Sequence, residues 1–370
     1  MTLSSQILKT LDNLYVRRNA PFSLVHFVTD RCNARCAHCF IDFSGSPNTS
    51  KELTVDEIGA LTRSIGNGLF NVNITGGEPF IRNDIFEIVK SYVENTEVRS
   101  IVITTNGFYV EAIEGLAAKY KQLKTKCHIN FSISIDNHER QHNANRNVEG
   151  LYARALESYR LIDAFDDKRV SASIALTVMP SNQSNIVDVF HHLLKQGVKD
   201  VFPVLLREEG VLKHIPDKSN VLHAYNELVR LIDEKVPGNI QGGTRSLFRA
   251  VQQAKNRIVH RILSSTYCSP RFIVPCNAGS LFGVIFADGR VSPCEPLDAS
   301  WTLGNLREYE MDFAAIWKSP AAEMIRRKIR SRKCHCTFEC AWSVNVLSYP
   351  VYWPLLSYHT IRELFWKPIA

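Results

Sequence analysis

Three cysteines near the amino-terminal end have the residue type and spacing of a metal site. Cys32, Cys36 and Cys39 form a C-x3-C-x2-C pattern, and the next cysteine along the chain is Cys127. Cysteine thiolates are the usual ligands of iron–sulfur clusters, and a [4Fe–4S] cluster normally takes four of them. Three neighbouring thiolates leave one iron of the cluster without a protein ligand. A reactive metal site needs such an open coordination position, whereas a structural site has all its positions filled. The pattern therefore predicts a cluster that binds a further ligand.

Two other uses of these cysteines fit less well. A structural zinc site usually pairs C-x2-C units with further cysteines or histidines, and His38 lies too close to the three thiols to complete such a pattern. A disulfide framework is typical of small secreted chains, whereas this one has 370 residues.

A second motif, Gly76-Gly77-Glu78-Pro79, follows an apolar run over residues 69–74. Glycines at a strand end let the backbone approach a ligand closely, and Glu78 could accept hydrogen bonds from a ligand ammonium group. Alone, this stretch is typical of an ordinary turn. Its position one strand–helix unit after the cysteine pattern makes it informative.

Together the two motifs resemble the radical S-adenosylmethionine (radical SAM) superfamily. The resemblance implies that Cys32, Cys36 and Cys39 hold a catalytic [4Fe–4S] cluster. In that family S-adenosylmethionine (SAM) chelates the open iron, and the stretch that corresponds to Gly76–Pro79 binds the methionine amino group. It also implies reductive cleavage of SAM to methionine and a 5′-deoxyadenosyl radical, with an electron donor such as flavodoxin or ferredoxin. One departure is His38, because the family often has an aromatic residue there.

Strand-like and helix-like segments alternate from residue 23 to about residue 235, which predicts parallel strands with right-handed crossovers. Six such units match the partial (β/α)6 barrel, TIM-like, of the radical SAM core, so the fold class is α/β. The predicted strands are Ser23–Thr29, Val72–Thr75, Ser100–Thr105, His128–Ile135, Val170–Val178 and Val201–Leu205.

Ligand-binding residues in such sheets lie at the carboxyl ends of the strands. Besides the two motifs, the resemblance suggests SAM contacts from Asn106, Ser134, Arg146 and Thr177, with Arg146 meeting the SAM carboxylate. Serine, threonine and asparagine at these places are equally typical of turn and helix caps.

Six further cysteines follow residue 265, namely Cys268, Cys276, Cys294, Cys334, Cys336 and Cys340. The residues 287–290 predict a hairpin turn between two strands. This part resembles the SPASM domain, or its shortened form called twitch, and implies a C-terminal α+β domain with one auxiliary [4Fe–4S] cluster. Cys276, Cys294 and Cys340 are the firmest ligands, Cys336 is favoured as the fourth, and Cys334 and Cys268 compete with it. Zinc is the alternative metal.

The chain divides into five predicted parts. A helical extension covers residues 1–22, the barrel 23–235, a linker and helix 236–265, the auxiliary-cluster domain 266–345, and an aromatic tail 346–370. The basic run over 325–333 suits a solvated helix face better than nucleic-acid binding. The tail suits packing or dimerisation, with peripheral membrane contact as the alternative.

The composition is that of a globular protein, with 45% hydrophobic and 22% charged residues. The net charge of +7 suits an anionic partner without identifying one. No signal peptide or apolar run of transmembrane length is present, and ten cysteines without a secretion signal predict a reducing compartment, the cytoplasm.

The substrate is the weakest inference from the sequence. Only 31 residues precede Cys32, fewer than the peptide-recognition domain of many peptide maturases needs. We therefore expect a small-molecule, sugar or lipid-linked substrate, with peptide maturation as the first alternative. A non-catalytic iron–sulfur or zinc scaffold is the second alternative.

Overall fold

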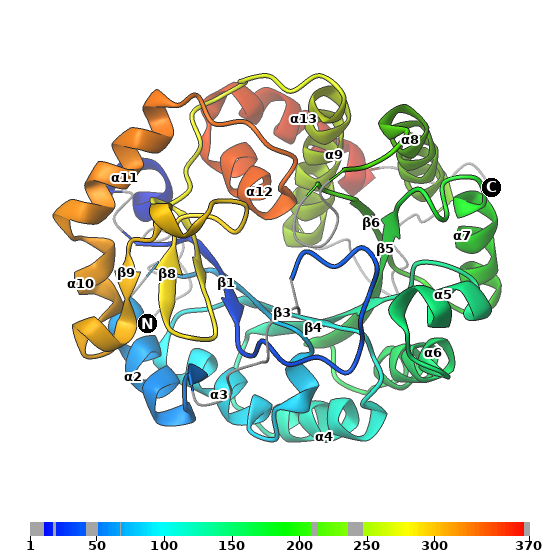
Figure 1. Ribbon diagram of the computed structural model, residues 1–370, viewed down its shortest axis with the longest axis horizontal. Coiled ribbons are helices and arrows are strands. Elements are labelled where there is room, and N and C mark those ends of the chain that lie inside the picture. The colour runs from blue at the N-terminus through cyan, green and yellow to red at the C-terminus, as the bar shows by residue number, and fades with distance from the viewer. Residues whose placement is uncertain are drawn as a thin grey trace.

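The computed structural model describes residues 11–17, 20–41, 51–66, 68–208, 214–235 and 247–365. Its described strands form one sheet in the order β6-β5-β4-β3-β2-β1-β7-β8-β9, with helices around the outside (Figure 1). The strands are β1 (Ser23–Phe27), β2 (Asn71–Thr75), β3 (Ser100–Thr105), β4 (His128–Ser134), β5 (Val170–Val178), β6 (Val201–Leu205), β7 (Phe282–Ile285), β8 (Arg290–Ser292) and β9 (Gly304–Asn305).

The described helices alternate with the first six strands and then form most of the C-terminal part. They are α2 (Val55–Ile65), α3 (Ile85–Asn95), α4 (Val110–Lys121), α5 (Glu139–Arg146), α6 (Leu151–Asp163), α7 (Ile186–Lys195), α8 (Lys218–Lys235), α9 (Leu247–Tyr267), α10 (Phe313–Trp317), α11 (Pro320–Ser331), α12 (Glu339–Ser348) and α13 (Trp353–Phe365). A short π-helix, η1 (Asn13–Arg17), precedes the sheet, and 3-10 helices η3 (Pro79–Ile81), η4 (Ala299–Trp301), η5 (Leu306–Tyr309) and η6 (Pro350–Tyr352) occupy connections.

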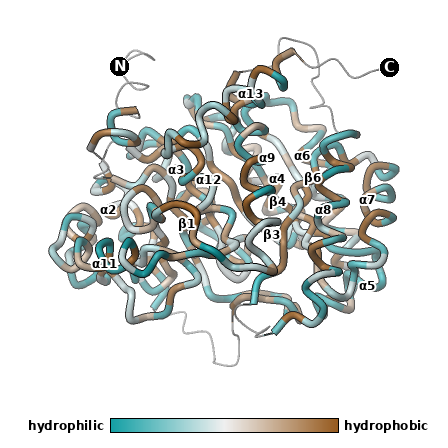
Figure 2. The backbone as a smooth tube through the Cα atoms, turned by 90° about the horizontal axis from the view of Figure 1, so that it is seen from above, coloured by the Kyte–Doolittle hydropathy of each residue, from teal (hydrophilic) through white to brown (hydrophobic). Residues whose placement is uncertain are grey.

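Strands β1 to β6 are all parallel, which confirms the predicted α/β partial barrel. Each predicted strand lies within two residues of an observed one. The sequence pattern succeeds here because alternate residues of β2, β3 and β4 are buried against the helices, and burial of apolar side chains drives this packing. Figure 2 shows hydrophobic stretches running through β1 and parts of α9.

Within the barrel region, sequence reasoning missed helix α5. It contains a single apolar residue, Ala144, so it has no hydrophobic periodicity to detect. Its inward face is polar, with His142, Asn143 and Arg146 buried. Helix α6 begins at Leu151, because Asn147 and Gly150 have left-handed backbone conformations that end α5 and start α6.

The C-terminal part continues the same sheet and is a mixed α+β region. Strand β7 pairs in parallel with β1, and β8 and β9 then pair antiparallel. The predicted hairpin turn is present, with Gly289 at a φ of 86° and the Asp288 side chain accepting from the Arg290 amide over 3.1 Å. The sheet therefore places the downstream cysteines beside the strand that leads into Cys32.

Part of the aromatic tail packs against helix α9, which follows the barrel. Helix α13 lies along α9 with His359, Thr360 and Glu363 buried, and Glu363 pairs with Arg257 at 2.9 Å. No helix among the described residues combines the length and apolar character that a membrane span needs. Predictions for residues 1–10, 209–210, 236–246 and 366–370 lie outside the described residues.

Candidate functional site

The loop that carries Cys32, Cys36 and Cys39 leaves the carboxyl end of β1, as predicted. All three are free, partly exposed thiols. The Ala34 amide donates to Cys32 Sγ and the Ile41 amide donates to Cys39 Sγ, each over 3.4 Å. Amide hydrogen bonds to sulfur are a regular feature of iron–sulfur sites and help to set their potential. The loop therefore fits a cluster that is ligated by these thiolates.

The Gly76–Gly77 turn packs directly on the backbone of this loop. The Gly77 amide donates to the Thr29 carbonyl over 2.9 Å, and the Glu78 amide donates to the Arg31 carbonyl over 2.7 Å. A Cβ atom on Gly77 would lie 2.1 Å from the Arg31 carbonyl oxygen, and one on Gly76 would lie 2.3 Å from that of Thr29. Only glycine permits this approach, so the two motifs form one unit.

Glu78 is fully buried and ties the end of β2 to the end of β3. One carboxylate oxygen accepts from the Phe80 amide over 3.0 Å and from the Thr105 hydroxyl over 2.7 Å. The other accepts from the Asn106 amide over 2.7 Å. Burial raises the pKa of Glu78 to about 7 despite these three donors. Pro79 begins the short helix η3 that follows.

Asn106 also reaches the cysteine loop itself. Its side-chain nitrogen donates to the Asn33 side-chain oxygen over 2.7 Å, while its own oxygen accepts from the Phe108 amide over 3.0 Å. Sequence reasoning selected Asn106 but missed Asn33, although Asn33 directly follows Cys32. The bond joins the carboxyl end of β3 to the cysteine loop.

The last turn of α5 holds the other side of the loop. The Arg35 amide donates to the Arg146 carbonyl over 3.0 Å, and the Ala37 amide donates to the Asn145 carbonyl over 3.1 Å. The Asn145 side chain lies 3.2 Å from Nδ1 of His38. Helix α5, which sequence reasoning missed, thus supports the cysteine loop.

Arg146 pairs with Asp136, which follows β4, and both are buried. Arg146 Nε and Nη2 lie 2.9 and 2.6 Å from Asp136 Oδ2, while the Thr177 amide donates to Oδ1 over 3.2 Å. Burial opposes ionisation of Asp136, but the Arg146 charge outweighs it and the pKa falls to about 2. Sequence reasoning placed Arg146 against the SAM carboxylate, whereas here its guanidinium is paired within the protein.

The remaining predicted contacts lie at the same edge of the sheet. Ser134 ends β4 and Thr177 is the last residue but one of β5, and the side chains of both are half-buried. Strand register places Ser134 opposite Ala175, two residues before Thr177. The structure therefore brings the predicted SAM contacts to one edge of the sheet.

The three thiols are neutral when no metal binds them. Burial raises the pKa of Cys32 to about 12 and that of Cys39 to about 11, and it also raises the pKa of Cys36. The nearby Arg146 charge acts in the opposite direction on Cys36 and Cys39. Burial also lowers the pKa of His38, so its 3.7 Å approach to Asp136 is not an ion pair at neutral pH. A bound metal deprotonates thiols of this kind.

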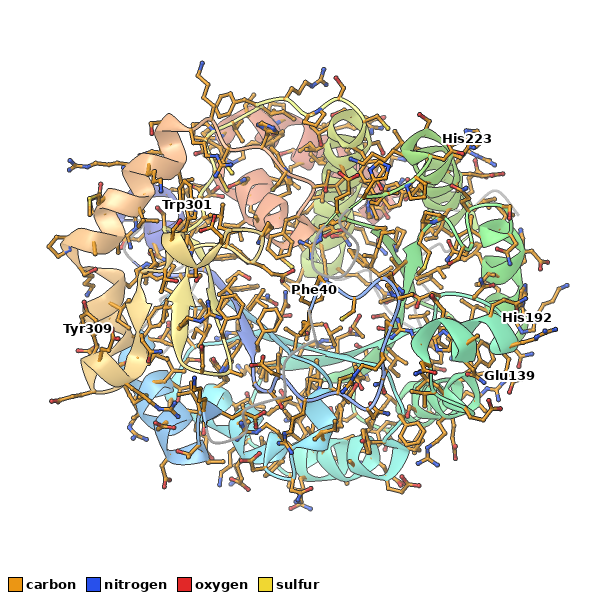
Figure 3. All side chains as sticks on the ribbon, in the orientation of Figure 1. Phe40, Glu139, His192, His223, Trp301 and Tyr309 are labelled. Carbon is orange, nitrogen blue, oxygen red and sulfur yellow. The ribbon has the colours of Figure 1, made fainter. Side chains whose placement is uncertain are left out.

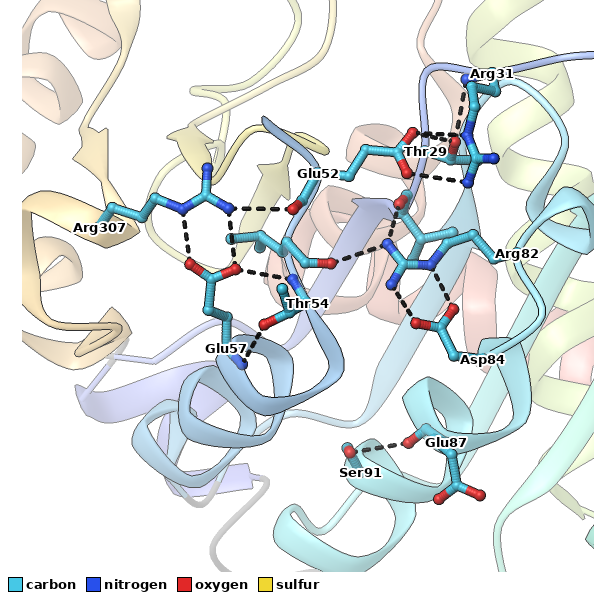
Figure 4. Close-up of polar contacts among 12 residues, drawn as sticks. Thr29, Arg31, Glu52, Thr54, Glu57, Arg82, Asp84, Glu87, Ser91 and Arg307 are labelled. Carbon is cyan, nitrogen blue, oxygen red and sulfur yellow. Dashed lines mark hydrogen bonds and ion pairs between the residues drawn. The ribbon is translucent and has the colours of Figure 1, made fainter. Parts of the chain in front are cut away.

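A charged network supports the cysteine loop from the connections that follow β2 and precede α2 (Figure 4). Buried Arg82 donates through Nη1 to the carbonyls of Val28 and Leu53, each over 2.9 Å, and its other nitrogens bind Asp84. Glu52 accepts from Thr29 and from Arg31. A pocket of about 420 Å³ lies there, lined by Arg31, Glu52, Leu53, Thr54, Val55, Ile81, Arg82, Asn83 and Asp84.

Five of the six downstream cysteines belong to a second hydrophobic core. Cys294 is buried in this core, and four further cysteines pack against the core, namely Cys276, Cys334, Cys336 and Cys340. Cys268 is exposed and lies outside this group. The Asn73 side chain donates to Cys340 Sγ over 3.4 Å, which links the group to β2. Cys127, by contrast, is a buried core thiol.

Among the described residues, we find no group of three or more histidine, cysteine or acidic side chains that could hold a single metal ion. The five thiols share instead an apolar surrounding that contains Phe282 and Phe338. The hydrophobic shell of a cluster controls solvent access and potential.

Arg207 lies between the two cysteine groups. It follows β6, and its Nη2 lies 2.5 Å from Oε1 of Glu295, the residue after Cys294. Its guanidinium carbon is 4.6 Å from the Phe338 ring centre and 5.9 Å from that of Phe40, which follows Cys39. Figure 3 shows Phe40 in the middle of the ring of strands and helices.

Comparison with protein families gives two matches. The radical SAM superfamily model matches residues 27–193. The SPASM model, an iron–sulfur cluster-binding domain, matches residues 276–341. The first matched segment contains Cys32, Cys36 and Cys39, and the second contains the five gathered cysteines. Cys268 lies in neither segment.

Solved structures with the same fold include anSMEcpe and the Streptococcus suis protein SuiB. The structure of anSMEcpe with bound AdoMet is 15% identical over 92% of this chain and 98% of its own, with a TM-score of 0.58. The same values describe anSMEcpe with AdoMet and the Kp18Cys peptide. SuiB bound to the precursor peptide SuiA is 16% identical over 94% of this chain and 77% of its own, also with a TM-score of 0.58.

Proposed function

We propose that a peptide is the substrate of this chain, which belongs to the radical SAM superfamily and carries a SPASM iron–sulfur domain at its carboxyl end. It is a radical SAM enzyme that uses SAM and a [4Fe–4S] cluster. When bound, this cluster supplies the electron for reductive cleavage of SAM to methionine and a 5′-deoxyadenosyl radical. The rest of the proposal concerns what the residues of this chain do.

Cys32, Cys36 and Cys39 would hold that cluster, and the packing of Gly77 on the loop would fix their positions. Glu78, once ionised, offers negative charge at the strand ends where the ammonium group of SAM would lie. The Arg146–Asp136 pair would keep α5 against the cysteine loop. These residues orient the cofactors and exclude water, which is the protein's part in cofactor chemistry.

For the SPASM domain we propose one auxiliary [4Fe–4S] cluster. Its four thiolates would come from the five gathered cysteines, Cys276, Cys294, Cys334, Cys336 and Cys340. Exposed Cys268, a candidate in the sequence-based set, is the least suitable. Five thiols are too few for two fully ligated clusters, which need eight.

The choice of a peptide reverses the preference that the sequence suggested. The observation that carries it is the match over more than nine-tenths of this chain to anSMEcpe and SuiB, both solved with bound peptides. A match of this length takes in most of the SPASM region as well as the barrel. At 15–16% identity these structures share the fold, and the peptide substrate is our inference for this chain.

The test uses the reconstituted enzyme with SAM, dithionite and short peptides encoded beside its gene. A peptide substrate predicts a mass change in one peptide that depends on SAM and is absent from the Cys32→Ala variant. Formation of 5′-deoxyadenosine without any change in these peptides, together with conversion of a sugar or lipid-linked compound, would overturn the proposal while leaving the radical SAM chemistry intact.

A further inference from the structure

We infer that the outer face of helix α11 is a docking surface for an acidic protein that carries electrons at low potential. The inference rests on the reductive cleavage of SAM, which needs one electron, and not on the peptide substrate. Helix α11 lies at the outer edge of the molecule, beside the hairpin of β7 and β8 (Figure 1). With the next two residues it carries six cationic side chains and one acidic one, Glu323.

The cations on this face have different roles. Arg326 is mostly buried and donates to the carbonyls of Gly279 and Trp317, so it anchors the helix. Arg327 and Arg330 point outward, with side chains 76% and 48% exposed. Both approach Glu323, at 3.2 and 3.1 Å, but a single carboxylate leaves the pair with excess positive charge.

Trp301 holds two more cations in place. Lys328 Nζ lies 3.8 Å from its ring centre and the Arg332 guanidinium lies 5.2 Å from it. Figure 3 shows Trp301 beside α11, and its ring is buried. Cation–π contacts restrict long side chains that otherwise move freely in water. Two of the positive charges are therefore held in fixed positions. A helix face that only contacts water has no need of such fixed charges.

The surface also includes one exposed apolar side chain. Met324 is 65% exposed on the same helix, one turn before Arg327 and Lys328. Protein–protein contacts combine apolar side chains with charged and polar ones, and methionine is enriched in them. Transient redox complexes need only a small contact area, so one helix face is sufficient. This pattern favours an acidic protein over a nucleic acid, for which exposed methionine adds nothing.

The basic face ends at the downstream cysteines. Lys333 directly precedes Cys334, and Cys334 and Cys336 belong to the gathered group around Cys294. A carrier on this face would lie next to the auxiliary cluster that these thiolates would hold. In the transfer step the carrier would be oxidised by one electron and the auxiliary cluster reduced by one. The auxiliary cluster would then pass that electron to the cluster on Cys32, Cys36 and Cys39, where SAM cleavage consumes it.

The test is the binding of reduced and oxidised flavodoxin to the reconstituted enzyme by calorimetry at low and high salt. Arg327→Glu with Arg330→Glu should weaken binding at least tenfold and flatten its salt dependence. Lys124→Glu with Lys126→Glu is the matched control, because these exposed lysines precede β4, far from α11 in the sheet order, and should leave binding unchanged. Arg327→Gln with Arg330→Gln serves if the charge reversal perturbs folding, and a threefold or greater loss is then expected.

Two further readouts separate the outcomes. Carbodiimide cross-linking should join flavodoxin carboxylates to Lys328 or Lys333, as mapped by mass spectrometry. Flavodoxin-driven formation of 5′-deoxyadenosine should fall in the α11 variants while dithionite-driven formation stays constant, and neither measurement needs a peptide. Equal flavodoxin binding by both double variants, cross-links confined to other surfaces, or an oligonucleotide that displaces flavodoxin from α11 would each overturn the inference.

Discussion

Arg146 and Asp136 form a buried ion pair in which two guanidinium nitrogens, Nε and Nη2, approach one carboxylate oxygen at 2.9 and 2.6 Å. The pair joins the end of β4 to the last residue of α5. Because the carbonyl of Arg146 also accepts the Arg35 amide, the pair reaches the cysteine loop through a single residue. The pair therefore supports the loop through its backbone, and among the described residues neither side chain hydrogen-bonds to one of the three thiols.

Arg146→Met should be the most damaging single change outside the cysteines. It leaves the Asp136 charge buried without its partner, and such a loss typically costs about 3–5 kcal/mol. We expect a fall of that size in the free energy of unfolding, measured by urea denaturation, and a lower iron content after reconstitution. Arg230→Met is the control, because the exposed Arg230–Glu234 pair on α8 contributes at most about 1 kcal/mol. Similar losses in both variants would contradict this account.

Gly77→Ala should displace the cysteine loop. The added methyl group would lie 2.1 Å from the Arg31 carbonyl oxygen, so either the turn or the loop must move. We expect the variant to incorporate less iron and to lose at least tenfold in the rate of SAM cleavage. Gly115→Ala is the matched control, because a Cβ atom there meets nothing within 4 Å. The control should gain about 0.5–1 kcal/mol from its position within α4. Equal iron content in both variants would contradict the role of Gly77.

The affinity for SAM should depend on pH through Glu78. Its pKa is raised from 4.5 to about 7 by burial, so the carboxylate is ionised above that pH and protonated below it. Because an ammonium ligand favours the ionised form, we expect SAM to bind about tenfold more weakly at pH 6 than at pH 8, as measured by equilibrium dialysis.

A loss of folding stability through Glu78 does not explain weaker SAM binding at pH 6. A raised folded-state pKa makes Glu78 most favourable to stability below pH 4.5, and this contribution declines as the pH rises to about 7. Glu78→Gln should bind SAM weakly at both pH values, whereas Glu111→Gln, an exposed change on α4, should keep the wild-type profile. A profile for Glu78→Gln that still changes between pH 6 and pH 8 would place the titrating group elsewhere.

Replacing different downstream cysteines should have different effects on the iron content of the protein. Cys294→Ala removes the buried thiol of the gathered group and should lower the iron content by about four atoms per chain, the content of one cluster. Cys268→Ala should keep all the iron, because Cys268 is exposed and lies outside the group. Iron analysis and electron paramagnetic resonance of both variants check this. Full iron content in Cys294→Ala would exclude it as a ligand.

Much of the fold was predictable because its elements have regular hydrophobic patterns. The six parallel strands and the hairpin turn at Gly289 follow from alternation and turn residues. Helix α5 was not predictable, because its buried face is made of His142, Asn143 and Arg146. Such a face is stable only when its polar groups find partners on other elements, and those partners are distant in the sequence.

The same division applies to the site. The type and spacing of Cys32, Cys36 and Cys39, with Gly76 to Pro79, determined the chemistry, because thiolate ligands and closely approaching backbone depend on the residues themselves. The sequence also separated the two groups of cysteines. Only the tertiary structure decided that Arg146 pairs with Asp136, that Cys268 lies apart and that Arg207 stands between the groups. Those relationships depend on distances between residues that are far apart along the chain, and local patterns do not encode such distances.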